Sequence, residues 1–175
     1  ARHSHPIFGT LLAAGLGLGF LVGNAPGTAA QPMEMKIGFI TINDSQHETA
    51  KLFTEELAKR TNGAIQGRIF PAGQLGSIAR QIEGIQFGTQ EVFISPPGFF
   101  VGINPAFQAP DAPGMFESVW HQHKALNHPL VRDKFLAHAD QANITGLSIW
   151  AAGKTSIATR TPVKTLDHLK GMKLR

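Results

Sequence analysis

The chain has 175 residues, of which 42% are hydrophobic and 16% are charged, a balance typical of a folded globular protein. It contains no cysteine, which excludes disulfide frameworks and thiolate metal sites. The formal net charge is +4, but the Lys and Arg residues are scattered and are not interleaved with aromatic residues. This pattern argues against a nucleic-acid-binding surface, and no nucleic-acid partner is expected.

The first thirty residues differ in composition from the rest of the chain. Arg2 precedes an apolar stretch at residues 7–22, "IFGTLLAAGLGLGFLV", and a segment of small residues then ends at Ala30. This order predicts a secretory signal peptide over residues 1–30, cleaved between Ala30 and Gln31. A membrane anchor is the alternative, but the apolar stretch is glycine-rich and short for a span of about 20 residues.

Strand and helix patterns alternate after this leader. Runs rich in β-branched and aromatic residues predict strands at residues 35–42, 64–70 and 91–95. Apolar residues at helical spacing predict helices at residues 48–61 and 77–87 between them. The order strand, helix, strand, helix, strand predicts an α/β fold with a mostly parallel sheet flanked by helices.

Beyond the third strand the pattern is less regular. Five prolines predict a loop over residues 96–113. The elements expected after it are helices at 117–126 and 130–139, strands at 144–151 and 155–159, a helical turn at 166–169 and a strand that begins at 172.

A ligand site is expected where the parallel strands end. In open parallel sheets, ligands bind at the carboxyl ends of the strands. In this chain those places are residues 41–47, 70–76, 95–100 and 150–155, with Arg175 as the next one.

Two blocks of sequence resemble a known family. "FPAGQLG" at residues 70–76 precedes a helix with "IEGIQFGTQEV", and "TPVKTLDHLKGMKLR" occupies residues 161–175. In this order and at this spacing the blocks resemble the solute-binding proteins of TRAP transporters, the DctP-type family. The resemblance covers nearly all of residues 36–175.

The resemblance implies a two-lobed, type II-like periplasmic-binding-protein fold that closes around an organic acid. Residues 31–152 are then the first α/β lobe, and residues 153–175 are the crossover and the start of a second lobe that is largely missing. The protein would be a periplasmic receptor and not an enzyme. It would deliver a small carboxylate to the membrane subunits of a TRAP permease, without a metal or cofactor.

The resemblance also implies a carboxylate clamp. Arg175 matches the family's clamping arginine, and a guanidinium offers a planar fork of donors that fits a carboxylate. Many members carry a second arginine where this chain has Thr155, and the adjacent Lys154 supplies a positive charge as a flexible point charge. Without the resemblance, Arg175 reads as a solvated terminal residue and Lys154 as an exposed lysine at a strand end.

Four further residues are candidate ligand contacts at the strand ends: Asn43, His47, Gln74 and Phe99. His47 reads equally well as a residue at the start of a helix that is hydrogen-bonded to the backbone. The loop "SPPGFFVGINP" at residues 95–105 lacks the polar contacts of sialic-acid-binding members, so a polyol acid would leave hydroxyl groups unpaired. A smaller or partly apolar carboxylate is the better expectation.

Other functional classes find less support in the sequence. His121, His123 and His128 are close in sequence, but residues i and i+2 of a helix do not share a face, and no metal is expected. No nucleophile motif or phosphate-binding loop favours a hydrolase, and Ser45 is better explained as a helix cap. An ABC-type solute-binding protein is the nearest alternative.

Overall fold

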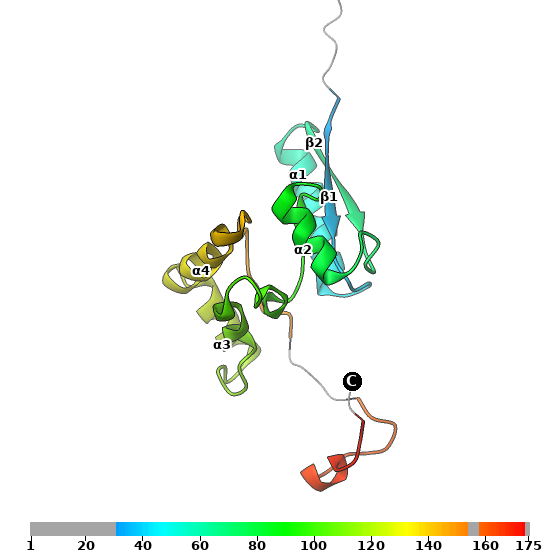
Figure 1. Ribbon diagram of the computed structural model, residues 1–175, viewed down its shortest axis with the longest axis vertical. Helices are drawn as coiled ribbons and strands as arrows, with labels where there is room; N and C mark the ends of the chain where they lie inside the picture. Colours follow the sequence, from blue (N-terminus) through cyan, green and yellow to red (C-terminus); the bar gives the residue numbers. More distant parts are fainter. Residues whose placement is uncertain (1–30, 154–157, 174–175) are drawn as a thin grey trace, which may run out of the picture. The chain divides into compact units, whose positions relative to one another are not determined.

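Residues 31–153 and 158–173 are described in the computed structural model of the chain (Figure 1). Within them, β1 (Met33–Gly38) lies at the centre of a three-stranded sheet, between β2 (Ile65–Phe70) and β3 (Val92–Phe93). Both pairings are parallel, with Ile37 opposite Ile69 on one side and Val92 on the other. The predicted parallel α/β sheet is therefore confirmed.

The two predicted helices between the strands are present, with their ends shifted by at most three residues. Helix α1 (Ser45–Arg60) begins after Asp44, whose carboxylate caps it, so the prediction that Ser45 is the cap was wrong. Helix α2 (Ile78–Phe87) begins after Ser77, whose hydroxyl oxygen accepts from the N–H of Arg80, and it ends at the left-handed Gly88. An aspartate at the cap position is as effective as a serine, so sequence preference alone does not separate the two.

Helices α1 and α2 cover opposite faces of the sheet. Gly67 of β2 lies against Thr54 of α1, whereas Gly38 of β1 lies against Gln81 of α2. Gly67 pairs with Met35, and side chains at positions 35 and 38 of one strand point to opposite faces. Right-handed crossovers, which are the rule between parallel strands, produce this arrangement in the strand order β2-β1-β3.

The hydrophobic core lies along β1 and its continuation. Ile37 and Phe39 are fully buried, and they form a cluster with Ala50 of α1 and Ile94. Trp150 packs against the same cluster. Burial of each large side chain contributes on the order of 1.5–3 kcal/mol.

Short helical segments follow β3. They are η1 (Pro97–Phe100), η2 (Pro105–Asp111), α3 (Val119–Asn127), α4 (Pro129–Leu136), η3 (Ala137–Ala142) and η4 (Leu166–Leu169). Successive aromatic contacts connect the first of them: Phe100 lies 6.1 Å from Phe93 and 5.7 Å from Phe107 between ring centroids. Phe107 in turn meets Phe135 of α4 edge-on at 5.3 Å.

Two predicted strands differ from the structure. The first ends at Gly38 and not at residue 42, and residues 144–151 form no strand. Ile149 is nevertheless buried, and Gly146 packs closely against Leu136 of α4. A strand requires a hydrogen-bonded neighbour, and an apolar alternation can also be satisfied by packing against a helix. The predicted strand at 155–159 falls largely outside the described residues, as does the end of the strand begun at 172.

Gly38 is the position where the fold leaves least room for a side chain. A Cβ atom there would lie 2.2 Å from Oε1 of Gln81 and 2.6 Å from Nε2 of Gln90. We expect Gly38→Ala to lower the free energy of unfolding by about 2 kcal/mol or more, because the buried amides must move. Urea denaturation measures the change.

The matched control for this substitution is Gly102→Ala. Gly102 is exposed, and a Cβ there would meet nothing within 4 Å. It should change stability by less than about 0.5 kcal/mol. Equal effects of the two substitutions would contradict the steric account of Gly38.

Candidate functional site

The loops that follow the three strands are tied together at the carboxyl edge of the sheet. The N–H of Gly73 donates to the carbonyl of Phe39 at 2.9 Å, and the N–H of Ala72 donates to that of Thr41 at 3.0 Å. On the other side of β1, the N–H of Ile94 donates to the carbonyl of Gly38 at 3.0 Å. The structure therefore brings three of the predicted ligand-site segments to one edge.

The "FPAGQLG" segment is a tight turn. Ala72 and Gly73 both have positive φ angles, 53° and 70°, and the turn positions the two N–H groups that bind the loop after β1. Gly73 adopts this conformation freely, whereas Ala72 does so at a cost in strain. The side chain of Gln74 is exposed at the turn, so it is accessible to a ligand at this edge.

A buried pair of amide side chains, Gln81 and Gln90, lies beneath the loops of the same edge. Gln81 is 0% exposed and Gln90 is 4% exposed. Nε2 of Gln81 donates to the carbonyl of Gly76 at 3.0 Å, and Nε2 of Gln90 donates to Oε1 of Gln81 at 3.3 Å and to the carbonyl of Val92 at 2.8 Å. These bonds satisfy amides that would otherwise be costly to bury, and they connect α2, β3 and the turn after β2.

Asn43 and His47 lie together at the start of α1. The N–H of Asn43 donates to Nδ1 of His47 at 3.2 Å, and Asn43 has a left-handed backbone with φ of 57°. The His47 ring also packs on Phe39, with 5.4 Å between centroids. This hydrogen bond to the backbone agrees with the interpretation of His47 as a residue at the start of a helix. Because Nδ1 is used in the bond, Nε2 is the ring nitrogen that a ligand could reach.

Asp44 holds the start of α1 in place. Its Oδ1 accepts from the N–H groups of Gln46 and His47 at 3.1 and 3.2 Å. Burial alone would raise the pKa of Asp44, but hydrogen bonds from the Thr41 side chain and from these backbone N–H groups lower it below its ordinary value. Sequence reasoning missed this residue, although Asp followed by a helical pattern is a recognised cap signal.

Phe99 and Phe100, adjacent in η1, have different environments. Phe99 is 39% exposed, whereas Phe100 is half-buried between Phe93 and Phe107. Phe99 is therefore accessible from solvent and Phe100 fills the interior. Exposed Ile42 and Val101, at 55% and 41%, lie on the loops after β1 and β3 and add apolar surface to them.

The remaining predicted contacts, Lys154, Thr155 and Arg175, lie outside the described residues. The carboxylate clamp therefore stays a prediction. The sequence did not predict the amide pair, because two glutamines nine residues apart have no recognisable signature before the fold brings them together.

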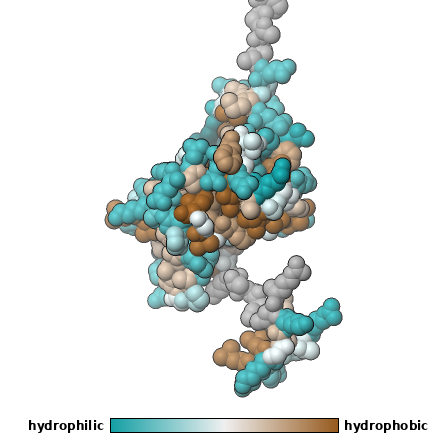
Figure 2. Space-filling view, viewed as in Figure 1, coloured by the Kyte–Doolittle hydropathy of each residue, from teal (hydrophilic) through white to brown (hydrophobic). Residues whose placement is uncertain are grey.

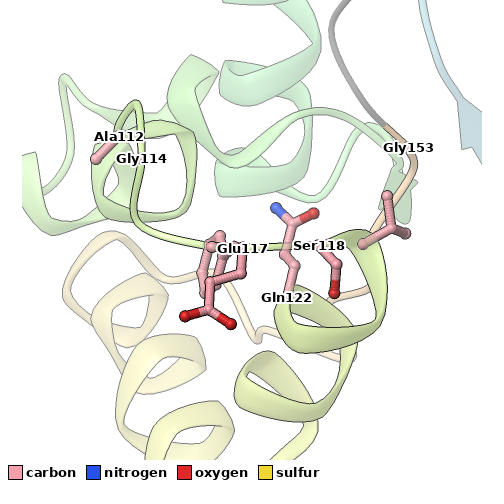
Figure 3. Close-up of a pocket in the computed structure, with 8 residues that line it drawn as sticks. Ala112, Gly114, Glu117, Ser118, Gln122 and Gly153 are labelled. Carbon is pink, nitrogen blue, oxygen red and sulfur yellow. The ribbon is translucent and has the colours of Figure 1, made fainter.

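A cavity of about 250 Å³ lies beside the start of α3, and Gly153 of the predicted 150–155 ligand segment also lines it. Figure 3 shows that Ser118 and Gln122 line it from the start of α3, with Glu117 from the preceding turn. Glu117 is the charged residue of this lining, and its carboxylate disfavours an organic anion. We therefore keep the carboxyl edge as the candidate site.

The histidines near this cavity have separate partners. Nδ1 of His121 accepts from the N–H of Glu117 at 3.3 Å, and His123 contacts Asn127. In residues 31–153 and 158–173, no group of three His, Asp or Glu side chains is arranged to hold a metal. Among the same residues, no helix combines the length and apolar character needed to cross a bilayer.

Comparison with protein families identifies one that fits most of the chain. The profile of the bacterial extracellular solute-binding proteins, family 7 (DctP), matches residues 39–175. The chain is 34% identical over 143 residues to the 2,3-diketo-L-gulonate-binding periplasmic protein of Escherichia coli K12, covering 81% of this chain and 43% of that protein. It is 26% identical over 149 residues to the C4-dicarboxylate-binding periplasmic protein of Rhodobacter capsulatus, covering 83% and 44%.

Solved structures agree on the fold. A TRAP periplasmic solute-binding protein from Xanthobacter autotrophicus with bound β-D-galacturonate superimposes with a TM-score of 0.71 at 28% identity, covering 78% of this chain and 46% of that one. The predicted periplasmic-binding-protein-like lobe is thereby confirmed. The chain spans less than half the length of each of these three proteins.

The cap at α1 makes stability depend on pH in a defined direction. The pKa of Asp44 in the folded protein lies below its unfolded value of about 3.9. The charged carboxylate therefore stabilises the fold at pH values above about 3.9. This stabilisation is lost as the pH falls through the folded pKa. Asp44→Asn keeps a capping oxygen without the charge. In urea unfolding, wild type should be more stable than this variant by about 0.5 kcal/mol at pH 6.

The difference between wild type and Asp44→Asn should shrink as the pH falls below about 3.9 and disappear once the pH is below the folded pKa of Asp44. Asp44→Ala, which removes the cap altogether, should cost about 1 kcal/mol at pH 6. A wild-type advantage that is constant over this pH range would show that the charge of Asp44 is not involved.

Proposed function

We propose, from the premise that this chain belongs to the bacterial extracellular solute-binding protein family 7, that it is a periplasmic receptor for a small organic acid. It delivers the acid to the membrane subunits of a TRAP-type permease and does not transform it. The observation that carries this proposal is the family match over residues 39–175, which includes both the strand-end turn and Arg175.

The related proteins support a carboxylate as the ligand. The names of the E. coli and R. capsulatus proteins refer to a sugar acid and to C4-dicarboxylates, and the X. autotrophicus structure holds a uronate. These three ligands share an ionised carboxylate and differ in the rest of the molecule. The receptor therefore needs one constant anion contact and variable contacts around it.

We assign the constant contact to Arg175. Its guanidinium stays charged at physiological pH and can bind both carboxylate oxygens, which fixes the orientation of the acid. In this proposal Lys154 contributes a positive charge and Thr155 a hydroxyl group to the binding of the acid. Closing the cleft strengthens these contacts because water is excluded.

The variable contacts indicate a ligand that is small or partly apolar. On the described strand-end loops, the exposed side chains Ile42 and Phe99 are apolar, and Asn43 and Gln74 offer amide groups. His47 contributes at most its Nε2 nitrogen, since Nδ1 is occupied. Several ligand hydroxyl groups would find few partners here, and unpaired buried hydroxyl groups are costly.

The chain organisation that goes with this function has three parts. Residues 1–30 are a cleavable signal peptide, residues 31–152 are the first lobe, and residues 153–175 are the crossover and the start of the second lobe. A hinge between the lobes then closes on the acid. On its own, this 175-residue chain should bind acids weakly.

Replacement of Arg175 tests the function directly. In the protein expressed from its complete gene, Arg175→Ala should weaken binding of the best carboxylate by about 100-fold or more, because a charged contact in a closed cleft is lost. Isothermal titration calorimetry against succinate, L-malate, D-galacturonate and 2,3-diketo-L-gulonate identifies that carboxylate. Recovery of the unchanged acid after incubation separates a receptor from an enzyme.

Two further variants serve as controls. Arg175→Lys keeps the charge but not the fork and should lose about tenfold in affinity. Arg60→Ala removes an exposed arginine from α1, where its side chain is 82% exposed, and should leave binding unchanged. If Arg175→Ala binds as tightly as wild type, Arg175 is not the clamp.

Phe99 tests the ligand class separately. Phe99→Ala should weaken binding of a carboxylate with an apolar substituent, such as phenylacetate or 2-ketoisovalerate, by about tenfold and leave succinate nearly unchanged. Phe87→Ala is the matched control, since Phe87 is 80% exposed at the end of α2. A preference for polyol acids in wild type would reject the ligand class and leave the receptor function intact.

A further inference from the structure

The turn that ends α1 contains the one Asn-Gly pair of the sequence. Asn62 and Gly63 follow Thr61, the residue that caps the end of α1, and they precede β2. Glycine has no side chain to shield its backbone nitrogen. That nitrogen can attack the side-chain carbonyl carbon of a preceding asparagine, which makes asparagine thermolabile in such a pair.

The reaction needs only water as a co-reactant. The nitrogen of Gly63 loses its proton to solvent and forms a bond to Cγ of Asn62, while the bond from Cγ to Nδ2 breaks and ammonia leaves. Water then opens the resulting succinimide ring at either carbonyl, which gives aspartate or isoaspartate. Both products carry a negative charge that Asn62 lacks, and isoaspartate adds a methylene group to the main chain.

The folded turn occupies the attacking nitrogen. The N–H of Gly63 donates to the carbonyl of Ala58 at 2.8 Å, and the N–H of Asn62 donates to that of Lys59 at 3.3 Å. Asn62 and Gly63 both have positive φ angles, 50° and 77°, as is common where a helix ends and its last carbonyls need donors. For the attack, the N–H of Gly63 must lose its proton and so give up its hydrogen bond.

The hydroxyl group of Thr61 holds this turn closed. It donates to the carbonyl of Leu57 at 2.8 Å and accepts from the N–H of Ile65 at 3.1 Å. The N–H of Ala64 donates to the carbonyl of Thr61 at 3.0 Å, and the carbonyl of Ala64 accepts from the N–H of Met33 at 2.9 Å. The turn at residues 61–64 is therefore joined to the end of α1 and to the starts of β1 and β2.

We propose that Asn62 is a site of spontaneous deamidation and that the turn at residues 61–64 controls its rate. The side chain of Asn62 is exposed, so water reaches it in the folded protein. While the turn is closed, the nitrogen of Gly63 is occupied and Asn62 persists. When the turn opens, the pair reacts as it does in an unfolded chain, and helix ends open more easily than the whole fold.

The modification weakens the turn that had prevented it. Isoaspartate lengthens the main chain inside a turn whose hydrogen bonds depend on its length. The new negative charge lies at the end of α1 where the helix dipole is also negative. Lys59 and Arg60 adjoin this charge, but both are already paired with Glu55 or Glu56.

The site lies away from the candidate ligand edge. Helix α1 begins at Ser45, beside the carboxyl edge of the sheet, and the turn after Arg60 lies before the start of β2. Deamidation therefore lowers stability and leaves the affinity for a ligand unchanged. The statement about the ligand rests on the proposed function, whereas the modification does not.

The test follows conversion of Asn62 by mass spectrometry of peptides. The protein expressed from its complete gene is incubated in warm, mildly alkaline buffer, either folded or in concentrated urea. We expect conversion in urea to be faster by about tenfold or more. Asn143 is an internal control, since it also has a left-handed backbone but precedes the β-branched Ile144, so in urea it should convert more slowly than Asn62.

A substitution outside the reacting pair tests the control by the turn. Thr61→Val removes the hydroxyl group and should speed conversion of Asn62 in the folded protein by about fivefold, with no change in urea. Thr145→Val is the matched control, since Thr145 is exposed and lies outside the turn, and it should change neither rate.

Three outcomes would overturn the proposal. If Asn62 stays intact in urea, it is not a deamidation site. Equal rates for the folded and the urea-treated wild type would show that the turn does not protect Asn62, and this comparison decides the matter even if Thr61→Val does not fold. A folded Thr61→Val variant that converts at the wild-type rate would exclude the turn as the controlling element.

The ligand is tested separately on the deamidated fraction, which ion exchange separates by its added charge. Calorimetry with succinate should give the same affinity for this fraction as for the unmodified protein. A loss of affinity would contradict the placement of the ligand at the carboxyl edge and leave the modification itself established.

Discussion

The buried amide pair of Gln81 and Gln90 is the contact on which the arrangement of the carboxyl edge depends. Two carboxamides at 0% and 4% exposure are tolerated only because they bond to each other and to the carbonyls of Gly76 and Val92. Those carbonyls belong to the turn after β2 and to β3, so one contact fixes both relative to α2. The absence of a side chain at Gly38 makes the space for it.

Backbone hydrogen bonds hold the loops of this edge together, and several of their side chains are exposed. Hydrogen bonds between the loops hold the turn at residues 71–76 against the segment after β1. The exposed side chains Ile42, Gln74 and Phe99 are then presented from fixed positions. A receptor family can change its ligand by changing such side chains while the anion contact stays the same, which agrees with the different acids bound by the related proteins. Figure 2 shows apolar side chains at the surface of the molecule. Trp120 is one exposed apolar residue, at 77% exposure.

The first part of the fold was predictable because its elements are locally consistent. The helix over residues 45–60 has apolar residues at about helical spacing and a stop at Asn62 and Gly63, and the strands around it are rich in β-branched residues. The error at residues 144–151 has a physical cause, since alternation reports burial and does not report a hydrogen-bonded neighbour. The prediction of Ser45 as a cap was wrong because the residue before it, Asp44, is of an equally suitable type and takes the cap position.

The sequence by itself determined the family resemblance, the order of the elements, the parallel sheet and the turn at "FPAGQLG". These features depend on residues close together in the chain or on their fixed spacing. Only the tertiary structure decided that Phe100 is interior while Phe99 is accessible, that Gln81 and Gln90 share a buried bond, and that Nδ1 of His47 is already occupied. The physical reason is that burial and hydrogen-bond partnership belong to pairs of groups, and which groups meet is known only when helices and strands have packed.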